Sequence, residues 1–428
     1  MTAAQPTDEQ TTPGPGADPS TAAVAASAVG SWTVGGRLSG ADGVRAIACL
    51  MVVFSHLFQK LDLPAQQPWL QDLQAFAMKG AFGVSVFFVL SGMLLSLPFW
   101  RAYAEGGQYP HLGRYVRRRA ARIVPGYYAS LLVSVGIGLL ILPEAPHVLR
   151  RLVAGLTFTS GFHYVTFFPA EANGPLWSIG LEVVSYVLMP AAMMLLFAWR
   201  RRGAARAALW WVGVLALTLA VNQAIITWLQ TDEAQKGWQY GVVGGAKEWM
   251  PWYNPVGFFG HFMLGIAAAG LIVFVGRWQA GRQSRWFDLG ALGFLLAVVV
   301  LLWARRSPPE PDLSFSLQGQ PYFFPVFPAL VAGLLVCTAG STVVGRVLDN
   351  RFARYTAKVS FGIYLWHYLV LAVVEHLTGG RFAGYWGIAN PVEHLMFSAA
   401  ILTVSYAIAS ASWYLLEKPV LTSRWARA

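Results

Sequence analysis

The feature that most constrains this chain is a series of apolar stretches about as long as a bilayer is thick. A membrane-spanning helix needs roughly 20 consecutive, mostly apolar residues. The sequence contains ten such stretches, at 43–60, 80–99, 123–142, 176–198, 208–230, 254–276, 287–304, 322–340, 357–377 and 393–415. This pattern predicts an all-α, polytopic integral membrane protein with about ten transmembrane helices.

The composition excludes the main alternatives to a membrane protein. Of the 428 residues, 56% are hydrophobic and only 12% are charged, whereas a soluble domain carries about 25% charged residues. A soluble enzyme, a disordered chain and a coiled coil therefore do not fit. Both cysteines, Cys49 and Cys337, lie in apolar stretches, so we expect neither a disulfide framework nor a metal site.

The basic residues indicate how the helices are oriented. With a cytoplasmic N-terminus, ten helices place 21 Lys and Arg residues on the cytoplasmic side and nine on the other side. This asymmetry agrees with the positive-inside rule. The net charge of +11 is thus explained by topology, without a nucleic acid partner. We predict that both termini are cytoplasmic and that the protein lies in the bacterial cytoplasmic membrane.

The chain divides into three segments. Residues 1–40 are rich in Ala, Thr, Pro and Gly, and this composition predicts a disordered cytoplasmic tail. Residues 41–418 form the transmembrane domain, and 419–428 form a short cytoplasmic tail.

Polar side chains inside apolar stretches are costly in hydrocarbon and therefore suggest function. Arg45 and His56 are eleven residues apart, which places them on one face of a helix and about 16 Å apart along its axis. A cation near the cytoplasmic end and an imidazole deeper in the membrane suit a long ligand with an anionic head and a reactive tail. Snorkelling of Arg45 and simple packing of His56 explain either residue alone equally well.

An arginine cluster precedes the third stretch and exceeds what orientation requires. It consists of Arg114, Arg117, Arg118, Arg119 and Arg122. Guanidinium groups bind phosphates through paired hydrogen bonds, so Arg118, Arg119 and Arg122 are candidates for holding a nucleotide-like anion. Attraction to anionic lipid is the alternative. Glu417, near the chain's end, is expected to pair with Lys418 or with an arginine on the cytoplasmic side.

Two further stretches each carry a polar helix face. These faces consist of Ser178, Glu182 and Tyr186, and of Ser360, Tyr364 and His367. Glu182 has no basic residue in its own stretch, so we expect a partner elsewhere, such as His56 or an arginine, and a role in an active site. A structural ion pair is the alternative for Glu182, and hydrogen-bonded packing is the alternative for His367.

Five segments, taken together, resemble the acyltransferase-3 family of integral membrane O-acyltransferases. They are DGVRAIACLMVVFSH, GVSVFFVLSG, RRAARIVPGYY, GPLWSIGLEVVSYVLMP, and VSFGIYLWH followed by a late EKP. The resemblance covers nearly the whole chain after residue 40. Ser85 stands where many members have Asp, and Ser185 stands where many have Phe, but neither departure removes a polar group from the predicted site.

The resemblance implies transfer of an acyl group, with acetyl expected, from cytoplasmic acyl-coenzyme A to a hydroxyl group. The acceptor classes it implies are sugars, cell-envelope glycans or glycolipids, and glycosylated natural products. It also implies that His56 is the essential histidine, acting as a base or as an acyl carrier. Some relatives carry an appended SGNH-type hydrolase domain, which we do not expect here because the sequence ends soon after the last stretch.

We therefore expect His56 and Glu182 to be catalytic, with Glu182 orienting His56 or balancing its charge. The residues expected to bind coenzyme A are Arg45, Arg118, Arg119 and Arg122. The residues expected to bind substrate are Trp177, Ser178, Tyr186, Tyr364 and His367. A proton-coupled transporter or flippase is the rival interpretation, because buried charges also occur in such proteins. The arginine cluster at one end and the lack of visible repeats favour the acyltransferase.

Overall fold

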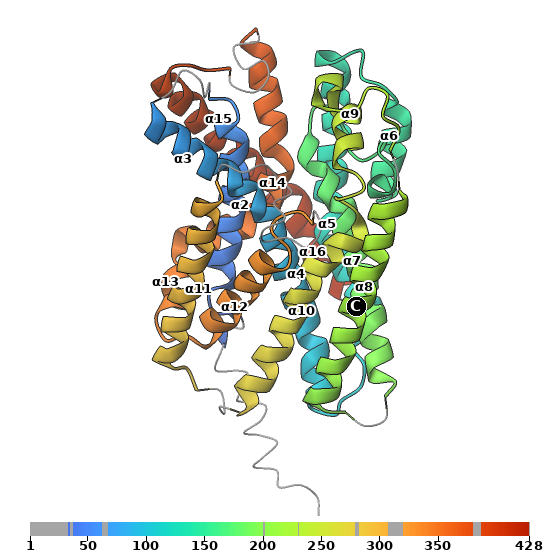
Figure 1. The fold of residues 1–428 in the computed structure, drawn as a ribbon, viewed down its shortest axis with the longest axis vertical. Helices are drawn as coiled ribbons and strands as arrows, with labels where there is room; N and C mark the ends of the chain where they lie inside the picture. The colour runs from blue at the N-terminus through green and yellow to red at the C-terminus, as the bar shows by residue number, and fades with distance from the viewer. Residues whose placement is uncertain are drawn as a thin grey trace, which may run out of the picture.

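The computed structural model describes residues 33–34, 37–61, 67–199, 202–229, 231–278, 282–306, 320–379 and 387–427. Within these ranges, long helices run roughly along the longest axis of the molecule (Figure 1). The only sheet there is a short antiparallel ladder between β1 (Thr33–Val34) and β2 (Arg37–Leu38). The protein is therefore all-α, as predicted.

Nine helical segments in the described part of the chain are long and apolar enough to cross a membrane, and α12 (Val326–Gly340) is a shorter apolar helix. The nine contain α2 (Ala41–Phe58), α4 (Gly83–Ala104), α5 (Leu112–Ile141), α7 (Trp177–Phe197), α8 (Ala204–Trp228), α10 (Pro255–Trp278), α11 (Arg285–Ala304), α14 (Arg351–Leu377) and α15 (Pro391–Ser412). Each of the ten predicted stretches overlaps one of these ten helices. The prediction of a polytopic membrane protein is confirmed.

Several short helices were not predicted. They are α3 (Pro68–Met78), α6 (Val148–Leu156), α9 (Gly241–Trp249), α13 (Val344–Leu348), α16 (Lys418–Thr422) and α17 (Arg424–Arg427), together with short turns at 79–82, 160–162, 174–176, 238–240 and 413–417. We call the end of the bundle that carries α6 and α9 the upper end (Figure 1). The opposite, lower end is the one near which α2 begins.

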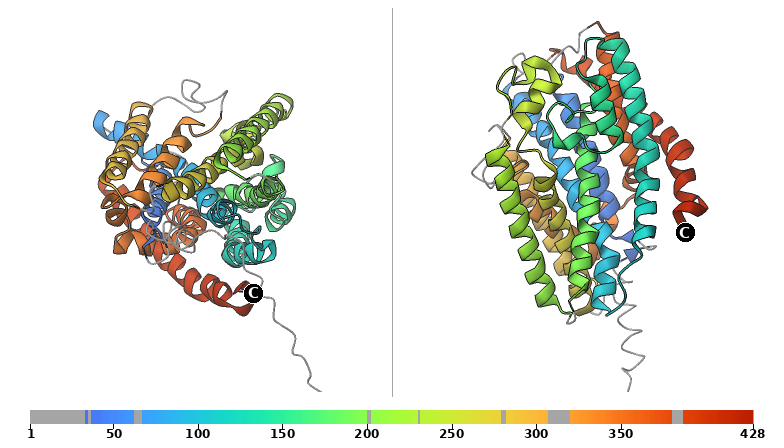
Figure 2. Two further views of the ribbon diagram at one scale, coloured as in Figure 1. Left: turned by 90° about the horizontal axis from the view of Figure 1, so that it is seen from below. Right: turned by 90° about the vertical axis from the view of Figure 1, so that its right-hand side faces the viewer.

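The centre of the bundle is built from closely packed helices. In the end-on view of Figure 2, α4 lies near the centre and α8 lies at the rim. Glycines permit the close approach of α4 and α10. A Cβ atom on Gly92 would overlap the Phe262 carbonyl oxygen, and one on Gly265 would overlap the Val89 carbonyl oxygen. Contacts through small residues of this kind are typical of packed membrane helices.

The start of α2 is tied to the loop before α14. Asp349 accepts hydrogen bonds from the backbone N–H of Gly40 and of Gly43, each at 2.8 Å. Burial raises the pKa of Asp349, while these two hydrogen bonds act in the opposite direction. The carboxylate supplies acceptors for backbone donors at the helix start, and so fixes the helix that carries Arg45 and His56.

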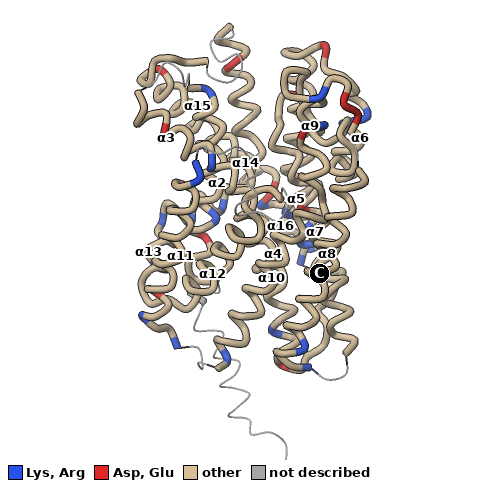
Figure 3. Tube along the Cα trace, in the orientation of Figure 1, with Lys and Arg blue, Asp and Glu red and all other residues tan. Residues whose placement is uncertain are grey.

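The charged residues are unevenly distributed along the bundle. Lys and Arg occur along the whole bundle, with one group of them at the lower end, whereas Asp and Glu lie mostly in the upper half (Figure 3). This distribution is what the positive-inside rule expects if the lower end faces the cytoplasm, and that orientation stays a prediction. Most of the predicted tail 1–40 lies outside the described residues. At the other terminus, α16 and α17 pack against α5.

Candidate active site

Two cavities of different character meet inside the bundle. The upper cavity has a volume of about 630 Å³ and is lined by His56 together with many aromatic side chains. The lower cavity has a volume of about 310 Å³ and is lined by Arg45, Arg119 and Arg122. Val84 and Tyr364 line both cavities, so these two residues form part of the wall between them.

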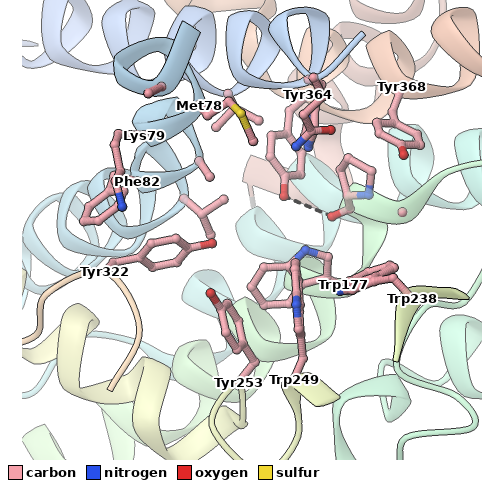
Figure 4. A pocket seen from close by; sticks show the side chains of 18 of the residues that line it. Met78, Lys79, Phe82, Trp177, Trp238, Trp249, Tyr253, Tyr322, Tyr364 and Tyr368 are labelled. Carbon is pink, nitrogen blue, oxygen red and sulfur yellow. Dashed lines mark hydrogen bonds between the residues drawn. The ribbon is translucent and has the colours of Figure 1, made fainter. Parts of the chain in front are cut away.

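Aromatic rings surround much of the upper cavity. Figure 4 shows Trp177, Trp249, Tyr253 and Tyr322 facing the same space. The rings of Trp249 and Tyr253 stack with centroids 4.5 Å apart, and Trp177 packs edge-on against Trp249 at 5.8 Å. These rings come from α7, from the last residue of α9 and from the segment that follows α9, and they hold one another in place.

His56 lies in the last turn of α2 and lines the upper cavity. Its Nδ1 atom is 2.9 Å from Nε2 of His367 on α14. The Nδ1 atom of His367 is in turn 2.9 Å from the Ile363 carbonyl oxygen and 3.0 Å from the Tyr364 carbonyl oxygen. His367 is only 1% exposed and lines neither of the two cavities. The structure therefore pairs the two histidines and places His56 alone at the cavity.

The wall between the cavities is held by hydrogen bonds. The Tyr364 hydroxyl donates to the Pro175 carbonyl oxygen at 2.9 Å, and it lies 2.7 Å from the Ser178 hydroxyl (Figure 4 shows Tyr364). Because the single hydroxyl hydrogen of Tyr364 is directed to Pro175, Ser178 is the donor toward Tyr364. These neutral bonds fix the Tyr364 ring across the boundary.

Glu182 does not reach His56, contrary to the expected pairing. Its carboxylate accepts hydrogen bonds from Ser91, at 2.7 Å, and from Tyr186, and it lines the lower cavity. The polar face of α7 descends toward the lower end, away from the last turn of α2, so His56 takes His367 as its partner instead. Ser91 is thus a polar partner of Glu182.

The expected coenzyme A residues divide into two groups. Arg45, Arg119 and Arg122 line the lower cavity, whereas Arg118 is exposed and is not part of its lining. Arg122 donates to Glu417 at 2.8 Å, which confirms that Glu417 pairs with a basic residue at this end. Among the described residues, neither Arg45 nor Arg119 forms an ion pair within 4 Å, so no carboxylate of the protein occupies either guanidinium group.

A third hollow, which we call the vestibule, adjoins the lower cavity. It has a volume of about 720 Å³. Its lining includes five basic residues, Arg45, Arg101, Arg122, Lys358 and Lys418. Arg45 and Arg122 line both spaces and therefore connect them. Sequence reasoning did not place Arg101, Lys358 and Lys418 in a site, because it assigned Arg101 and Lys358 to membrane orientation and considered Lys418 as a partner for Glu417.

The remaining predicted residues fall on different sides of the wall. Trp177 lines the upper cavity, whereas Ser178 and Tyr186 line the lower cavity. In the described part of the chain, no three His, Cys, Asp or Glu side chains gather as metal ligands. The site therefore consists of a basic space, an aromatic space and a histidine pair beside the wall that separates them.

These features define a polytopic membrane protein with two chemically different cavities and a histidine pair at the edge of one of them. The family of this protein follows from comparing its sequence with models of known families. The acyltransferase-3 profile, described as an acyltransferase domain, matches residues 38–410. The chain belongs to this family, and the resemblance noted from its motifs is confirmed.

Individual relatives point in the same direction. Putative peptidoglycan O-acetyltransferase YrhL of Bacillus subtilis (strain 168) is 26% identical over 399 residues, covering 90% of this chain and 55% of the relative. Nodulation protein 10 of Rhizobium leguminosarum bv. viciae is 24% identical over 412 residues, covering 91% and 95%. This chain thus spans about half of the first relative and nearly all of the second. No solved structure matches the chain.

Proposed function

We propose that this protein moves an acyl group, with acetyl expected, from cytoplasmic acyl-coenzyme A to a hydroxyl group of an acceptor in the upper cavity. The observation that carries this proposal is the shared wall. A basic cavity and an aromatic cavity meet at Val84 and Tyr364, with His56 on the aromatic side. Two substrates of different chemistry would thereby approach one imidazole from opposite directions.

The lower cavity and the vestibule suit the donor. Coenzyme A carries several phosphate charges, and guanidinium groups bind phosphates strongly through paired hydrogen bonds. Arg45 and Arg119 would hold the phosphates, with Arg122 beside them. The thioester arm would then extend along α2 toward His56, which is about 16 Å from Arg45 along the helix axis. Glu182 would balance part of the positive charge in this cavity.

His56 would act as the general base. Imidazole changes its protonation near neutral pH and can take the proton of an acceptor hydroxyl. The hydroxyl oxygen then forms a bond to the thioester carbonyl carbon, and the carbon–sulfur bond breaks. The departing thiolate takes the proton back from His56 and leaves as the free thiol. Tyr364 and Ser178 lie in the wall, and either hydroxyl would donate a hydrogen bond to the oxyanion that forms between these two steps after releasing its present acceptor, Pro175 or Tyr364.

The upper cavity suits a carbohydrate hydroxyl as acceptor. Trp177, Trp249 and Tyr253 offer flat apolar faces of the kind that pack against sugar rings, and polar groups such as Gln71 and Glu171 lie in the same lining. One relative is named for peptidoglycan and another for nodulation. We therefore propose a cell-envelope glycan, a glycolipid or a glycosylated natural product, modified at the bacterial cytoplasmic membrane.

Donor binding tests the proposal against a transporter. Purified protein would be titrated with acetyl-coenzyme A and, separately, with S-acetylpantetheine, which lacks the nucleotide and its phosphates. We expect acetyl-coenzyme A to bind much more tightly, because only it engages the basic residues of the lower cavity. Absence of acetyl-coenzyme A binding would contradict the proposal and favour a carrier, which has no reason to bind this donor.

A further inference from the structure

We propose that His367 is a positioning residue that fixes the protonation pattern of His56, so that Nε2 of His56 carries a lone pair when the acceptor arrives. This role rests on the proposed function, because the tautomer of His56 affects the reaction only if His56 acts as a base. It also assigns His367 a task different from the substrate contact expected from its sequence position.

The hydrogen atom on His367 is located by its backbone partners. Its Nδ1 atom lies 2.9 Å from the Ile363 carbonyl oxygen and 3.0 Å from the Tyr364 carbonyl oxygen. Carbonyl oxygens only accept hydrogen bonds, so Nδ1 of His367 must carry the hydrogen. A neutral imidazole has only one N–H group, and Nε2 of His367 is therefore an acceptor.

The tautomer of His56 follows from that acceptor. Nδ1 of His56 lies 2.9 Å from Nε2 of His367, so Nδ1 of His56 must be the donor in this pair. If its hydrogen were on Nε2 instead, two lone pairs would face each other across the same distance. The remaining Nε2 atom of His56 then has a free lone pair, and it has no hydrogen-bond partner among the described residues. Because His56 lines the upper cavity, this lone pair is available to an acceptor hydroxyl.

The pair also remains favourable after proton transfer. When Nε2 of His56 gains a proton, Nδ1 still donates to His367, and this bond becomes charge-assisted and stronger. A carboxylate performs the equivalent task for the histidine of a Ser-His-Asp triad. His367 performs it as a neutral group, which avoids burying a charge beside the membrane interior while His56 is neutral.

The neighbouring groups hold His367 in this orientation. The His56 and His367 ring centroids are 5.1 Å apart with planes inclined by 25°, and Tyr368 packs edge-on against His56 at 5.0 Å. His367 is 1% exposed, so water does not compete for its nitrogen atoms. The donor and acceptor roles are therefore set by protein groups alone.

A direct test reads the tautomer by nitrogen NMR of purified protein labelled with ¹⁵N-histidine, with the signals of His56 identified from their loss in His56→Ala. In the wild type at a pH where His56 is neutral, we expect hydrogen on Nδ1 and none on Nε2. In His367→Leu, we expect a substantial share of His56 to carry hydrogen on Nε2. Hydrogen on Nε2 in the wild type, or an unchanged pattern in His367→Leu, would overturn the role of His367.

A kinetic test uses three variants at the same position, with acetyl-coenzyme A as donor and methyl glucoside as the hydroxyl probe. In His367→Gln, an amide oxygen can still accept from His56, so kcat should stay within about 10-fold of the wild type. In His367→Asn and His367→Leu, no acceptor reaches His56, and kcat should fall by about 100-fold or more. The KM for acetyl-coenzyme A should be unchanged in all three.

The controls separate this role from a structural one and from failure of the proposed function. His376→Leu, at an exposed position near the end of the same helix, should leave kcat unchanged. Equal loss of kcat in the Gln, Asn and Leu variants, accompanied by a lower unfolding temperature, would show that His367 only packs. A further outcome is that the tautomer of His56 changes in His367→Leu as expected while the wild type shows no turnover that depends on His56. That result would contradict the proposed function and not the role of His367 in fixing the tautomer.

Discussion

The hydroxyl groups of Ser178 and Tyr364 lie 2.7 Å apart at the boundary between the basic and the aromatic cavity. Tyr364 also donates to the Pro175 carbonyl oxygen, which anchors its ring to the loop before α7. A wall at this position would keep the nucleotide part of the donor and the acceptor on opposite sides, and would limit the access of water to the thioester. It would also place two hydroxyl groups beside the reacting carbonyl, where each would donate to the oxyanion after releasing its present acceptor.

Removing the Tyr364 ring should connect the two cavities. In Tyr364→Ala, we expect acetyl-coenzyme A to be hydrolysed several-fold faster than in the wild type when no sugar acceptor is present, because water reaches the thioester. Tyr364→Phe keeps the ring and should not raise hydrolysis, although loss of the hydroxyl should slow transfer by about 10-fold or more. Release of free thiol measures both effects. Equal hydrolysis by the wild type and Tyr364→Ala would show that the ring is not a barrier.

Arg118 and Arg119 are adjacent in sequence, and only Arg119 lines the lower cavity. Arg119→Gln should weaken acetyl-coenzyme A binding by about 10-fold or more, since a charge-assisted phosphate contact contributes on the order of 1.5–3 kcal/mol. The matched variant Arg118→Gln should bind nearly as well as the wild type. Titration of both variants with acetyl-coenzyme A checks this difference, and equal weakening by both would argue against a specific phosphate site.

Close packing of α4 and α10 depends on Gly265. Gly265→Ala adds a methyl group that would overlap the Val89 carbonyl oxygen, so we expect a loss of about 1–3 kcal/mol in stability. Gly293→Ala in α11 is the matched change, because nothing lies within 4 Å of its added Cβ atom. The unfolding temperature in detergent should fall for Gly265→Ala and should be equal or higher for Gly293→Ala. A similar response of the two variants would contradict this packing.

Asp349 holds the beginning of α2 through two backbone hydrogen bonds. Asp349→Asn replaces one of the two acceptor oxygens with an amide donor, which would face a backbone N–H group. We expect a loss of about 1–2 kcal/mol in stability. A further effect should be weaker binding of acetyl-coenzyme A, because the same helix carries Arg45 four residues after Ala41. Unchanged unfolding temperature and binding would show that the helix start is held by other contacts.

The helices were predictable because a membrane-spanning helix needs a long run of consecutive apolar residues, and such a run can be recognised in the sequence without knowing its partners. The face shared by Arg45 and His56 followed from helix periodicity alone. Short helices such as α6 and α9 were not predicted, because their segments are too short and too polar to match the pattern of a spanning helix.

The partners inside the site were not predictable from single helices. His56 and His367 are 311 residues apart, and only the packing of α2 against α14 brings them together. Glu182 was expected to pair with His56 or an arginine because its own stretch has no basic residue. In the structure its carboxylate instead accepts hydrogen bonds from Ser91 and Tyr186. The difference between Arg118 and Arg119 likewise depends on how α5 is turned toward its neighbours.

The most direct test of the central claim is release of coenzyme A thiol by purified protein. Wild type and His56→Ala would be compared with acetyl-, propionyl- and succinyl-coenzyme A as donors, and with methyl glucoside present and absent. We expect release by the wild type, with acetyl preferred, and a loss of at least 100-fold in His56→Ala while acetyl-coenzyme A binding is kept. Release that is equally fast in His56→Ala would contradict a catalytic role for His56.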